Sequence, residues 1–251
     1  MNDISFKIFY PSVSPNTVTQ YSMQFDGVAE FITIPDDASY DFDGTTPFSM
    51  SVWFNSSDFT GFRPLFSKRV INGAGYMMSA FNGGLYFGLN NSNLNRIEVN
   101  TSMVLSTNTW YLFTVTYDGS QTAAGVKLYV NDAEEVKTIN NNNLTLSSAS
   151  GEPLQIGVNG TGGALFWLDY LGYIRIWNVE LTAQDVIDNY NGGIMSESPV
   201  NPLDLVLGWK SGTGALFNGT TWSFVDETDT NINPAPISVN MEFADRTTNI
   251  P

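Results

Sequence analysis

The sequence predicts an all-β protein built as a two-sheet antiparallel sandwich, with one short helix and a C-terminal extension. Two observations carry this prediction. Short runs in which apolar and polar residues alternate, the pattern of strands buried on one face, follow one another from residue 21 to residue 178. Turn signals rich in Gly, Asn and Asp separate these runs at intervals of about ten residues, as in β-sandwiches.

Each predicted strand is bounded by such a turn. Asp26-Gly27 separates the first two strands, and Asn82-Gly83 marks a hairpin further along the chain. The predicted strands cover residues 23–25, 31–34, 48–54, 76–80, 85–89, 110–117, 126–130, 134–138, 154–158 and 166–177, with further candidates at 203–209 and 221–225.

One helix is predicted near residues 182–190. Thr182 supplies an N-cap hydroxyl, Asp185 follows three residues later as in a capping box, and Asn191-Gly192 gives the stop. The chain then divides into three parts, an N-terminal arm (1–20), a sandwich domain (21–193) and a C-terminal extension (194–251).

The composition excludes several classes of protein. The 251 residues contain no Cys and no His, which excludes disulfides, thiol nucleophiles and Ser-His-Asp triads. The net charge is -15, from 10 Lys and Arg against 25 Asp and Glu, so no basic face for nucleic acid is expected. The sequence shows neither a signal-peptide pattern nor an apolar run of membrane-spanning length, which predicts cytoplasmic synthesis without membrane insertion.

Five stretches in a fixed order resemble the laminin-G-like, concanavalin-A-like jelly roll, in the branch related to pentraxins. They are YSMQFDGVAEFITIPDD at 21–37, FSMSVWFN at 48–55, WYLFTVTYDGS at 110–120, GVKLYVNDAEE at 125–135, and LQIGVNG at 154–160 followed by GYIRIWNVELTAQDVIDNY at 172–190. The resemblance implies a two-sheet antiparallel jelly-roll sandwich whose first and last core strands are adjacent. Residues 203–251 resemble the tail of laminin-G-like structural proteins of tailed phages.

The resemblance also bears on calcium, which members of this family often bind. It implies that Asp26 is a metal ligand and that a partner carboxylate lies in the final strand. That partner position is Gly172 here, followed by Tyr173, which removes an oxygen ligand and disfavours Ca²⁺ as a cofactor. Asp169 would compensate as a metal ligand only if the strand bulges at Gly172. The alternative is that Asp26 hydrogen-bonds its own turn.

Aromatic residues are the candidates for sugar binding, because exposed rings can line a ligand site. Trp53, Tyr86 and Trp167 are the predicted ligand-binding residues. Packing within the protein is the alternative for each tryptophan, and the resemblance implies it for Trp110 and Trp177, which it places inside the sandwich.

No catalytic residue is expected. Glycosidases need two carboxylates that face one cleft, whereas Glu134 and Glu135 are adjacent and point to opposite faces of a strand. Two acidic loops, at residues 36–43 and 227–229, are expected to be solvated, with divalent cations at subunit contacts as the alternative.

The preferred prediction is a non-enzymatic structural protein of a phage particle, either a capsid decoration or a head-fibre protein. It would be displayed on the virion surface, with the major capsid or tail protein, sister subunits and a glycan as partners. A secreted or cell-surface lectin is the alternative, and a glycan-degrading enzyme is disfavoured by the missing acid pair.

The two ends of the chain are predicted to anchor it to those partners. A short arm with two prolines buries little surface alone, and alternating apolar residues in the extension could add a strand to an exposed sheet edge. The alternative is that both ends fold back on their own sandwich. The predicted anchoring residues are Phe6, Phe9, Tyr10, Leu203, Leu205 and Trp209.

Overall fold

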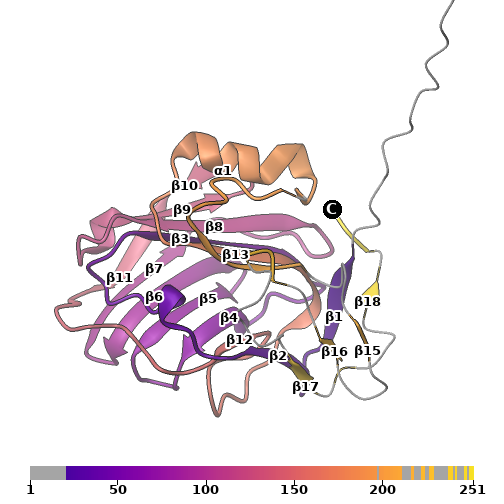
Figure 1. Cartoon of the computed structure of the whole chain (residues 1–251), viewed down its shortest axis with the longest axis horizontal. Coiled ribbons are helices and arrows are strands. Elements are labelled where there is room, and N and C mark those ends of the chain that lie inside the picture. Colours follow the sequence, from indigo (N-terminus) through magenta and orange to yellow (C-terminus); the bar gives the residue numbers. More distant parts are fainter. Residues whose placement is uncertain are drawn as a thin grey trace, which may run out of the picture.

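Two antiparallel β-sheets face each other, and helix α1 (Ala183–Tyr190) lies over one of them (Figure 1). The computed structural model describes residues 21–196, 198–210, 226–228, 241, 247 and 249–251, and the backbone of 216–217, 222–223, 237–239 and 246. The predicted fold class is therefore confirmed. Within these described ranges, no helix is long and apolar enough to cross a membrane.

The sheet beneath α1 has eight strands in the order β10-β9-β8-β3-β13-β1-β18, with β14 also paired to β13. The strands of this eight-stranded sheet are β1 (Ser22–Asp26), β3 (Phe48–Asn55), β8 (Tyr111–Tyr117), β9 (Val126–Val130), β10 (Ala133–Glu135), β13 (Leu168–Trp177), β14 (Leu205–Trp209) and β18 (Arg246–Thr247).

The opposite sheet has ten strands in the order β11-β7-β6-β5-β4-β12-β2-β17-β16-β15. The strands of this ten-stranded sheet are β2 (Phe31–Ile34), β4 (Phe62–Arg69), β5 (Gly75–Phe81), β6 (Gly84–Ser92), β7 (Asn95–Thr101), β11 (Lys137–Asn142), β12 (Leu154–Ile156), β15 (Leu216–Phe217), β16 (Trp222–Ser223) and β17 (Ile237–Val239). Three short 3₁₀ helices lie at Ala38–Tyr40, Ala123–Gly125 and Asn191–Gly193.

The first and last strands of the core are neighbours, as the resemblance implied. Strand β1 pairs antiparallel with β13, with Met23 opposite Leu171 and Asp26 opposite Leu168. The strands at 62–69 and 95–101 were not predicted: Pro64 and the register shift after it interrupt the alternation of the first, and the second has only two apolar residues, Ile97 and Val99. The single strand predicted at 134–138 is two strands in different sheets, β10 and β11, separated by Val136, which is 78% exposed.

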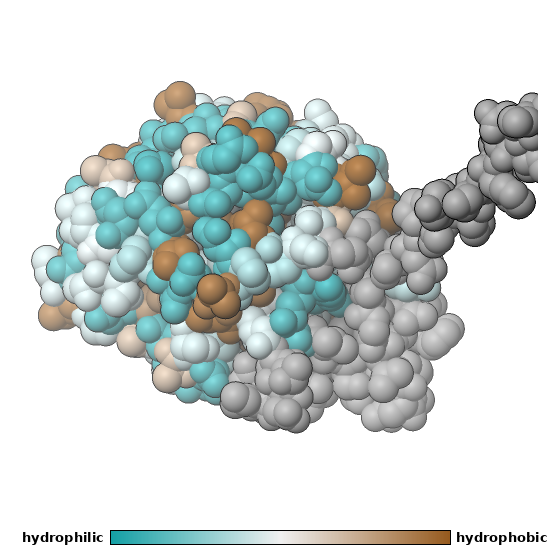
Figure 2. All heavy atoms as spheres, turned by 45° about the horizontal axis from the view of Figure 1, so that its top comes forward, coloured by the Kyte–Doolittle hydropathy of each residue, from teal (hydrophilic) through white to brown (hydrophobic). Residues whose placement is uncertain are grey.

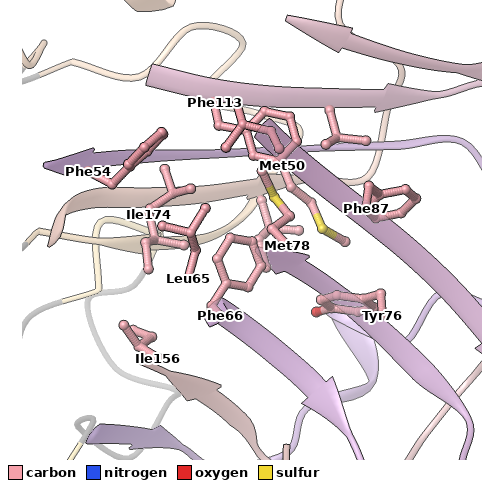
Figure 3. Close-up of a cluster of buried hydrophobic side chains, with 14 of the residues drawn as sticks. Met50, Phe54, Leu65, Phe66, Tyr76, Met78, Phe87, Phe113, Ile156 and Ile174 are labelled. Carbon is pink, nitrogen blue, oxygen red and sulfur yellow. The ribbon is translucent and has the colours of Figure 1, made fainter. Parts of the chain in front are cut away.

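The core lies between the two sheets and is filled by large apolar side chains (Figure 3). Strand β3 shows how alternation builds it, because Met50, Val52 and Phe54 enter the core while Ser49 and Ser51 face the other way. The labelled residues of Figure 3 come from both sheets, so this cluster holds the sandwich together: Met50, Phe54, Leu65, Phe66, Tyr76, Met78, Phe87, Phe113, Ile156 and Ile174.

Helix α1 begins where the capping box predicted it. The Thr182 hydroxyl accepts from the Asp185 backbone N–H, the Asp185 carboxylate accepts in return from Thr182, and Asn191 ends the helix in the left-handed conformation. The helix packs on the outer face of the eight-stranded sheet, where Val186 contacts the cluster of Trp177. The expectation that Trp177 packs inside the sandwich is therefore wrong.

The same outer face carries a second aromatic cluster. Trp53, Leu112 and Tyr173 are buried there with Met195, and Trp110 packs against them half-buried. The Trp53 ring stacks on the Tyr190 ring of α1 with centroids 5.6 Å apart. Trp110 was also expected inside the sandwich, and this prediction is wrong because its side chain, just before β8, packs on the outer face in the cluster that Tyr190 of α1 also joins.

The beginning of the C-terminal extension folds back on its own sandwich. Strand β14 pairs with β13, and its Leu205 and Trp209 side chains are 7% and 1% exposed. The prediction that these two residues anchor the chain to a partner is wrong, because the chain's own sheet already uses them. Leu203, just before the strand, is 97% exposed and stays a predicted anchor. The predicted anchors Phe6, Phe9 and Tyr10 lie outside the described residues.

Candidate functional site

The outer face of the ten-stranded sheet carries an unusual mixture of polar and aromatic side chains. Strands β4 to β7 send their apolar residues, such as Phe87 and Val99, into the core, so the alternate residues face outward. Six of these outward residues form a band with aromatic rings at one end and arginines at the other. We call this band the outer strip: Phe62, Phe81, Tyr86, Glu98, Arg96 and Arg69.

Tyr86 lies at the centre of the outer strip. Its ring extends over Gly88, where an added Cβ would come within 2.7 Å of the Tyr86 hydroxyl. That hydroxyl donates to Glu98 Oε1 at 2.6 Å. Burial and then the hydrogen bond to Glu98 raise the pKa of Tyr86 above its ordinary range, so the phenol remains a proton donor. Gly88 therefore provides the space in which Tyr86 reaches Glu98.

Glu98 is held by more than the phenol. Its Oε2 lies 3.1 Å from Arg96 Nε and accepts a hydrogen bond from the Asn141 side chain on the edge strand β11. The neighbouring Asn100 accepts from Asn140 at 2.6 Å. The centre of the outer strip is thus a connected network of amide, phenol and ionic groups, which offers both donors and acceptors to a hydroxyl-rich molecule.

Three aromatic rings form one end of the outer strip. The Phe62 centroid lies 5.8 Å from that of Phe81 and 5.5 Å from that of Tyr86. Phe81 is 38% exposed, so one of the three rings presents apolar surface to the solvent. This end provides the flat apolar contact that a sugar ring needs on its C–H face.

A shallow pocket of about 510 Å³ adjoins the aromatic end of the outer strip, where the β3–β4 and β5–β6 connections meet. The nearly fully buried side chains of Phe59 and Leu105 line the pocket, and so do the exposed residues Thr60 and Thr107. Apolar walls with a few polar groups are typical of small-molecule sites. The remaining lining residues are Ser57, Asp58, Gly61, Asn82 and Gly83.

Two of the three predicted sugar-binding residues cannot stack on a sugar. Trp53 is 2% exposed beneath α1, and Trp167 is 0% exposed in the core between the sheets. The prediction is wrong for both, because neither ring has a face open to solvent. Tyr86 is the exception, since it is 7% exposed on the outer strip and its role stays a prediction. Figure 2 shows a face of the molecule on which hydrophobic residues are scattered among hydrophilic ones.

Asp26 hydrogen-bonds its own turn. Its Oδ1 accepts from the backbone N–H groups of Val28, Ala29 and Glu30 at 2.8, 3.0 and 3.2 Å. Burial raises the pKa of Asp26, but these backbone donors outweigh it and leave that pKa below its ordinary value. Among the described residues, no three acidic side chains lie close enough together to hold a metal ion. The residues around Asp26 do not fit a calcium site.

Asp169 also uses its carboxylate locally. The pairing of β13 with β3 shifts register between Leu171 and Ile174, which is the bulge that metal binding by Asp169 required. However, Asp169 Oδ2 accepts from both the backbone N–H and the hydroxyl of Ser57 at 2.6 Å. The residue thus ties the β3–β4 loop to β13, and its role as a metal ligand stays a prediction.

Packing explains why residue 172 is a glycine. A Cβ at this position would come within 2.7 Å of Met195 Sδ and of Trp53 Cβ. The space that an acidic side chain would need is occupied by the cluster beneath α1. The departure from the family's calcium pattern is therefore coupled to how Trp53 and Met195 pack.

The sequence suggested that the acidic loop at residues 36–43 is solvated, but part of it forms ion pairs. Asp36 and Asp41 both bind the ammonium of Lys68, which is 0% exposed, and Asp36 Oδ1 lies 2.5 Å from its Nζ. The prediction is wrong for these two because a cation from β4 reaches them across the sheet. Lys68 and its neighbour Arg69 were missed, since nothing in the local sequence distinguishes them from surface residues.

Residues 26–187 match the Laminin_G_3 family, described as the concanavalin A-like lectin/glucanases superfamily. Since the match covers more than half of the chain, the protein belongs to this family. No match was found among curated protein sequences.

Several solved structures share the fold. A candidate carbohydrate-binding protein from Bacteroides ovatus aligns with a TM-score of 0.61 and 16% identity, over 90% of this chain and 60% of its own. The native heptameric SAP-like pentraxin of Limulus polyphemus aligns with a TM-score of 0.53 and 15% identity, over 84% of this chain and 94% of its own. The CBM40 of the Ruminococcus gnavus IT-sialidase, bound to α2,3-sialyllactose, aligns with a TM-score of 0.50 and 9% identity, over 67% of this chain and 95% of its own. This chain thus spans less than two thirds of the Bacteroides protein.

Proposed function

We propose that this protein is a non-enzymatic glycan-binding protein and that it holds an oligosaccharide on the outer strip. The observation that carries the proposal is the arrangement of Tyr86, which lies over Gly88, donates to Glu98 and contacts the Phe62 and Phe81 rings. Aromatic surface beside a fixed network of polar groups suits a sugar, which presents apolar C–H faces and hydroxyl edges. The carbohydrate-binding relatives with the same fold support it.

The length of the outer strip favours an oligosaccharide over a single sugar. The strip runs along strands β4 to β7, because the row of Phe62 and Phe81 lies six residues along β5 from the row of Arg69 and Gly75, about 20 Å at 3.3 Å per residue. The pocket beside Phe59 lies beyond its aromatic end and would take a further sugar unit. A chain of sugars lying along the strands would contact Phe81 first and the charged groups later.

Binding rather than hydrolysis is the activity we propose. Glu98 is the one carboxylate of the outer strip, and it is bound to Tyr86, Arg96 and Asn141. Glycoside hydrolysis uses two carboxylates across the scissile bond, one of them protonated. Incubation of the protein with the oligosaccharides that it binds should release no reducing ends.

A glycan array followed by calorimetry tests the proposal. Phe81→Ala removes the exposed ring and is expected to weaken binding about tenfold or more, as loss of a central aromatic contact does. Ile187→Ala is the matched control, because Ile187 is 44% exposed on α1, which packs on the other sheet, and the variant should bind as the unchanged protein does. Thr60→Trp, which fills the pocket, should weaken only the longer oligosaccharides. The proposal fails if no glycan binds or if Phe81→Ala binds normally.

The setting we propose for this binding is the surface of a phage particle. The support is the resemblance of residues 203–251 to phage structural proteins, and Leu203 is exposed beside the sandwich as an anchor would be. The test is co-purification with intact particles and the copy number per particle. Deletion of residues 1–18 should leave the protein folded and monodisperse but abolish its incorporation, whereas normal incorporation would contradict anchoring by the arm.

A further inference from the structure

The cationic end of the outer strip contains a buried arginine that has no carboxylate partner in the described part of the chain. Arg69 is 8% exposed, and no carboxylate of the described residues lies within ion-pair distance of it. Its Nη2 donates to Asn159 Oδ1 at 2.7 Å, and its Nη1 lies 3.2 Å from the Asn90 amide oxygen. Its buried Nε has no acceptor. Nε is therefore the nitrogen of this guanidinium that has no acceptor among the described residues.

Two other buried cations of the chain have carboxylate partners. Among the described residues, three cationic side chains are more than nine-tenths buried, Lys68, Arg69 and Arg175. Lys68 binds Asp36 and Asp41, and Arg175 binds Glu227 through two oxygens. Burial of a charge without a counter-ion is costly, and burial lowers the pKa of Arg69. In a chain with 25 acidic residues, the missing carboxylate at Arg69 calls for a reason.

The surroundings of Arg69 leave this end of the strip net positive. Arg96 faces outward in the same row, since Arg69 pairs with Gly75, Gly75 with Asn90, and Asn90 with Arg96 across the sheet. Glu98 is the one acid nearby and already pairs with Arg96. The local sum is one positive charge on a protein whose total is -15.

An unused acceptor lies on the same face. Gln155 on β12 pairs with Ser67, two residues before Arg69, so both side chains leave the sheet on one side. Gln155 is 8% exposed and its Oε1 has no hydrogen-bond partner. A donor and an acceptor with unmet capacity thus lie at diagonal positions of neighbouring strands, about 7–8 Å apart, as a sugar carrying both an anionic group and hydroxyls would require.

We infer that the cationic end of the outer strip selects acidic sugars, with Arg69 binding a carboxylate or sulfate group and Gln155 accepting from a neighbouring hydroxyl. This inference rests on the proposed glycan binding and names its substrate class. A guanidinium binds planar anions through paired N–H donors, and Arg69 has the donor to spare. The half-buried Asn159 lies beside it, and the half-buried Arg96 lies three strands away in the same row and supplies a further donor at the rim.

Matched oligosaccharides test the inference by calorimetry. Oligogalacturonides are compared with the same chains after their carboxyl groups are reduced to alcohols, and sulfated chondroitin oligosaccharides with their desulfated forms. The acidic member of at least one pair should bind about tenfold more tightly, which corresponds to one charge-assisted contact. The pair that shows the difference distinguishes carboxylate from sulfate.

Variants then locate the contact. Arg69→Gln should remove the preference for the acidic member while leaving binding of the neutral member within about twofold. Arg69→Lys keeps the charge but not the paired donors, and should recover only part of the preference. Glu152→Gln removes a charge elsewhere and serves as the control. Thermal unfolding of each variant checks that it folds, and Arg96→Gln at the more exposed rim provides a second variant if Arg69→Gln is unstable.

The outcomes separate the two proposals. Equal binding of acidic and neutral chains overturns the inference and leaves the glycan-binding proposal standing. No binding of any oligosaccharide overturns both. A preference for acidic chains that survives in folded Arg69→Gln and Arg96→Gln also overturns the assignment to this end of the strip.

Discussion

The guanidinium of Arg175 and the carboxylate of Glu227 form a buried two-point ion pair, with Nε–Oε2 at 2.7 Å and Nη2–Oε1 at 3.0 Å. Arg175 lies on β13, and its Nη2 also donates to the Ser196 carbonyl at 2.6 Å. Lys210 reaches Glu227 Oε1 from the end of β14, also at 3.0 Å. One carboxylate thus joins the sandwich to the extension, which the acidic pattern at 227–229 did not reveal.

Removal of this carboxylate should destabilise the protein strongly. We expect Glu227→Gln to lower the free energy of unfolding by about 3–5 kcal/mol, because it leaves the Arg175 charge buried and unpaired. The measurement is urea denaturation followed by tryptophan fluorescence. Glu180→Gln is the control, since its pair with Lys127 is 29% and 43% exposed and should contribute less than about 1 kcal/mol. Equal effects of the two variants would contradict the role given to Glu227.

Lys68 should be the cation that holds the loop at residues 36–43 and the segment near Ser150 against β4. Its ammonium binds Asp36 and Asp41 and donates to the Ser150 carbonyl. Lys68→Met keeps the length of the side chain but leaves two carboxylates close together without their cation, which we expect to cost about 3 kcal/mol. Hydrogen exchange should then increase in both segments first. Unchanged exchange there would show that the loop does not depend on Lys68.

Stability should fall in acid through the carboxylates that cap turns, and Asp43 is the clearest case. The Thr45 backbone N–H, at 2.8 Å, is the largest cause that lowers the pKa of Asp43 below its ordinary value of 3.8. Its contribution to stability is therefore present above about pH 4 and is lost as the pH falls through the lower folded pKa. Asp43→Asn should flatten the dependence of unfolding free energy on pH below 4. An identical acid profile would contradict this.

Restoration of the family's acid at residue 172 should damage packing rather than create a calcium site. Gly172→Asp forces an atom to within 2.7 Å of Trp53 Cβ and Met195 Sδ, and we expect a loss of about 1–3 kcal/mol. Gly151→Ala is the control, because its added Cβ would meet only Asp36 Oδ2, at 3.8 Å. Addition of CaCl₂ or EDTA should leave the unfolding temperature of both the unchanged protein and Gly172→Asp unaltered. A calcium-dependent rise would contradict this expectation.

The class of the fold and most of its strands could be predicted from the sequence, because the signals for them lie within short segments of the chain. Alternation sets which face of a strand is apolar, and the residues that favour turns end each strand within a few positions, so both signals lie within short windows. The capping residues Thr182 and Asp185 likewise located α1 without any distant contact. The strand at 62–69 was missed because Pro64 and the consecutive Leu65 and Phe66 break that alternation, and the strand at 95–101 because it has only two apolar residues, Ile97 and Val99.

The candidate site was not predictable in the same way, because the outer strip depends on pairings between strands that are distant in the sequence. Trp53 and Trp167 were candidates by residue type, yet α1 and the opposite sheet bury them. The contact of Tyr86 with Glu98 needs the register of β6 on β7 and the missing side chain at Gly88. Lys68 and Arg69 are consecutive on β4 and point to opposite faces of the sheet, so different loops reach them: Asp36 and Asp41 reach Lys68, and Asn159 reaches Arg69. These loops are distant in the sequence, and the fold brings them together.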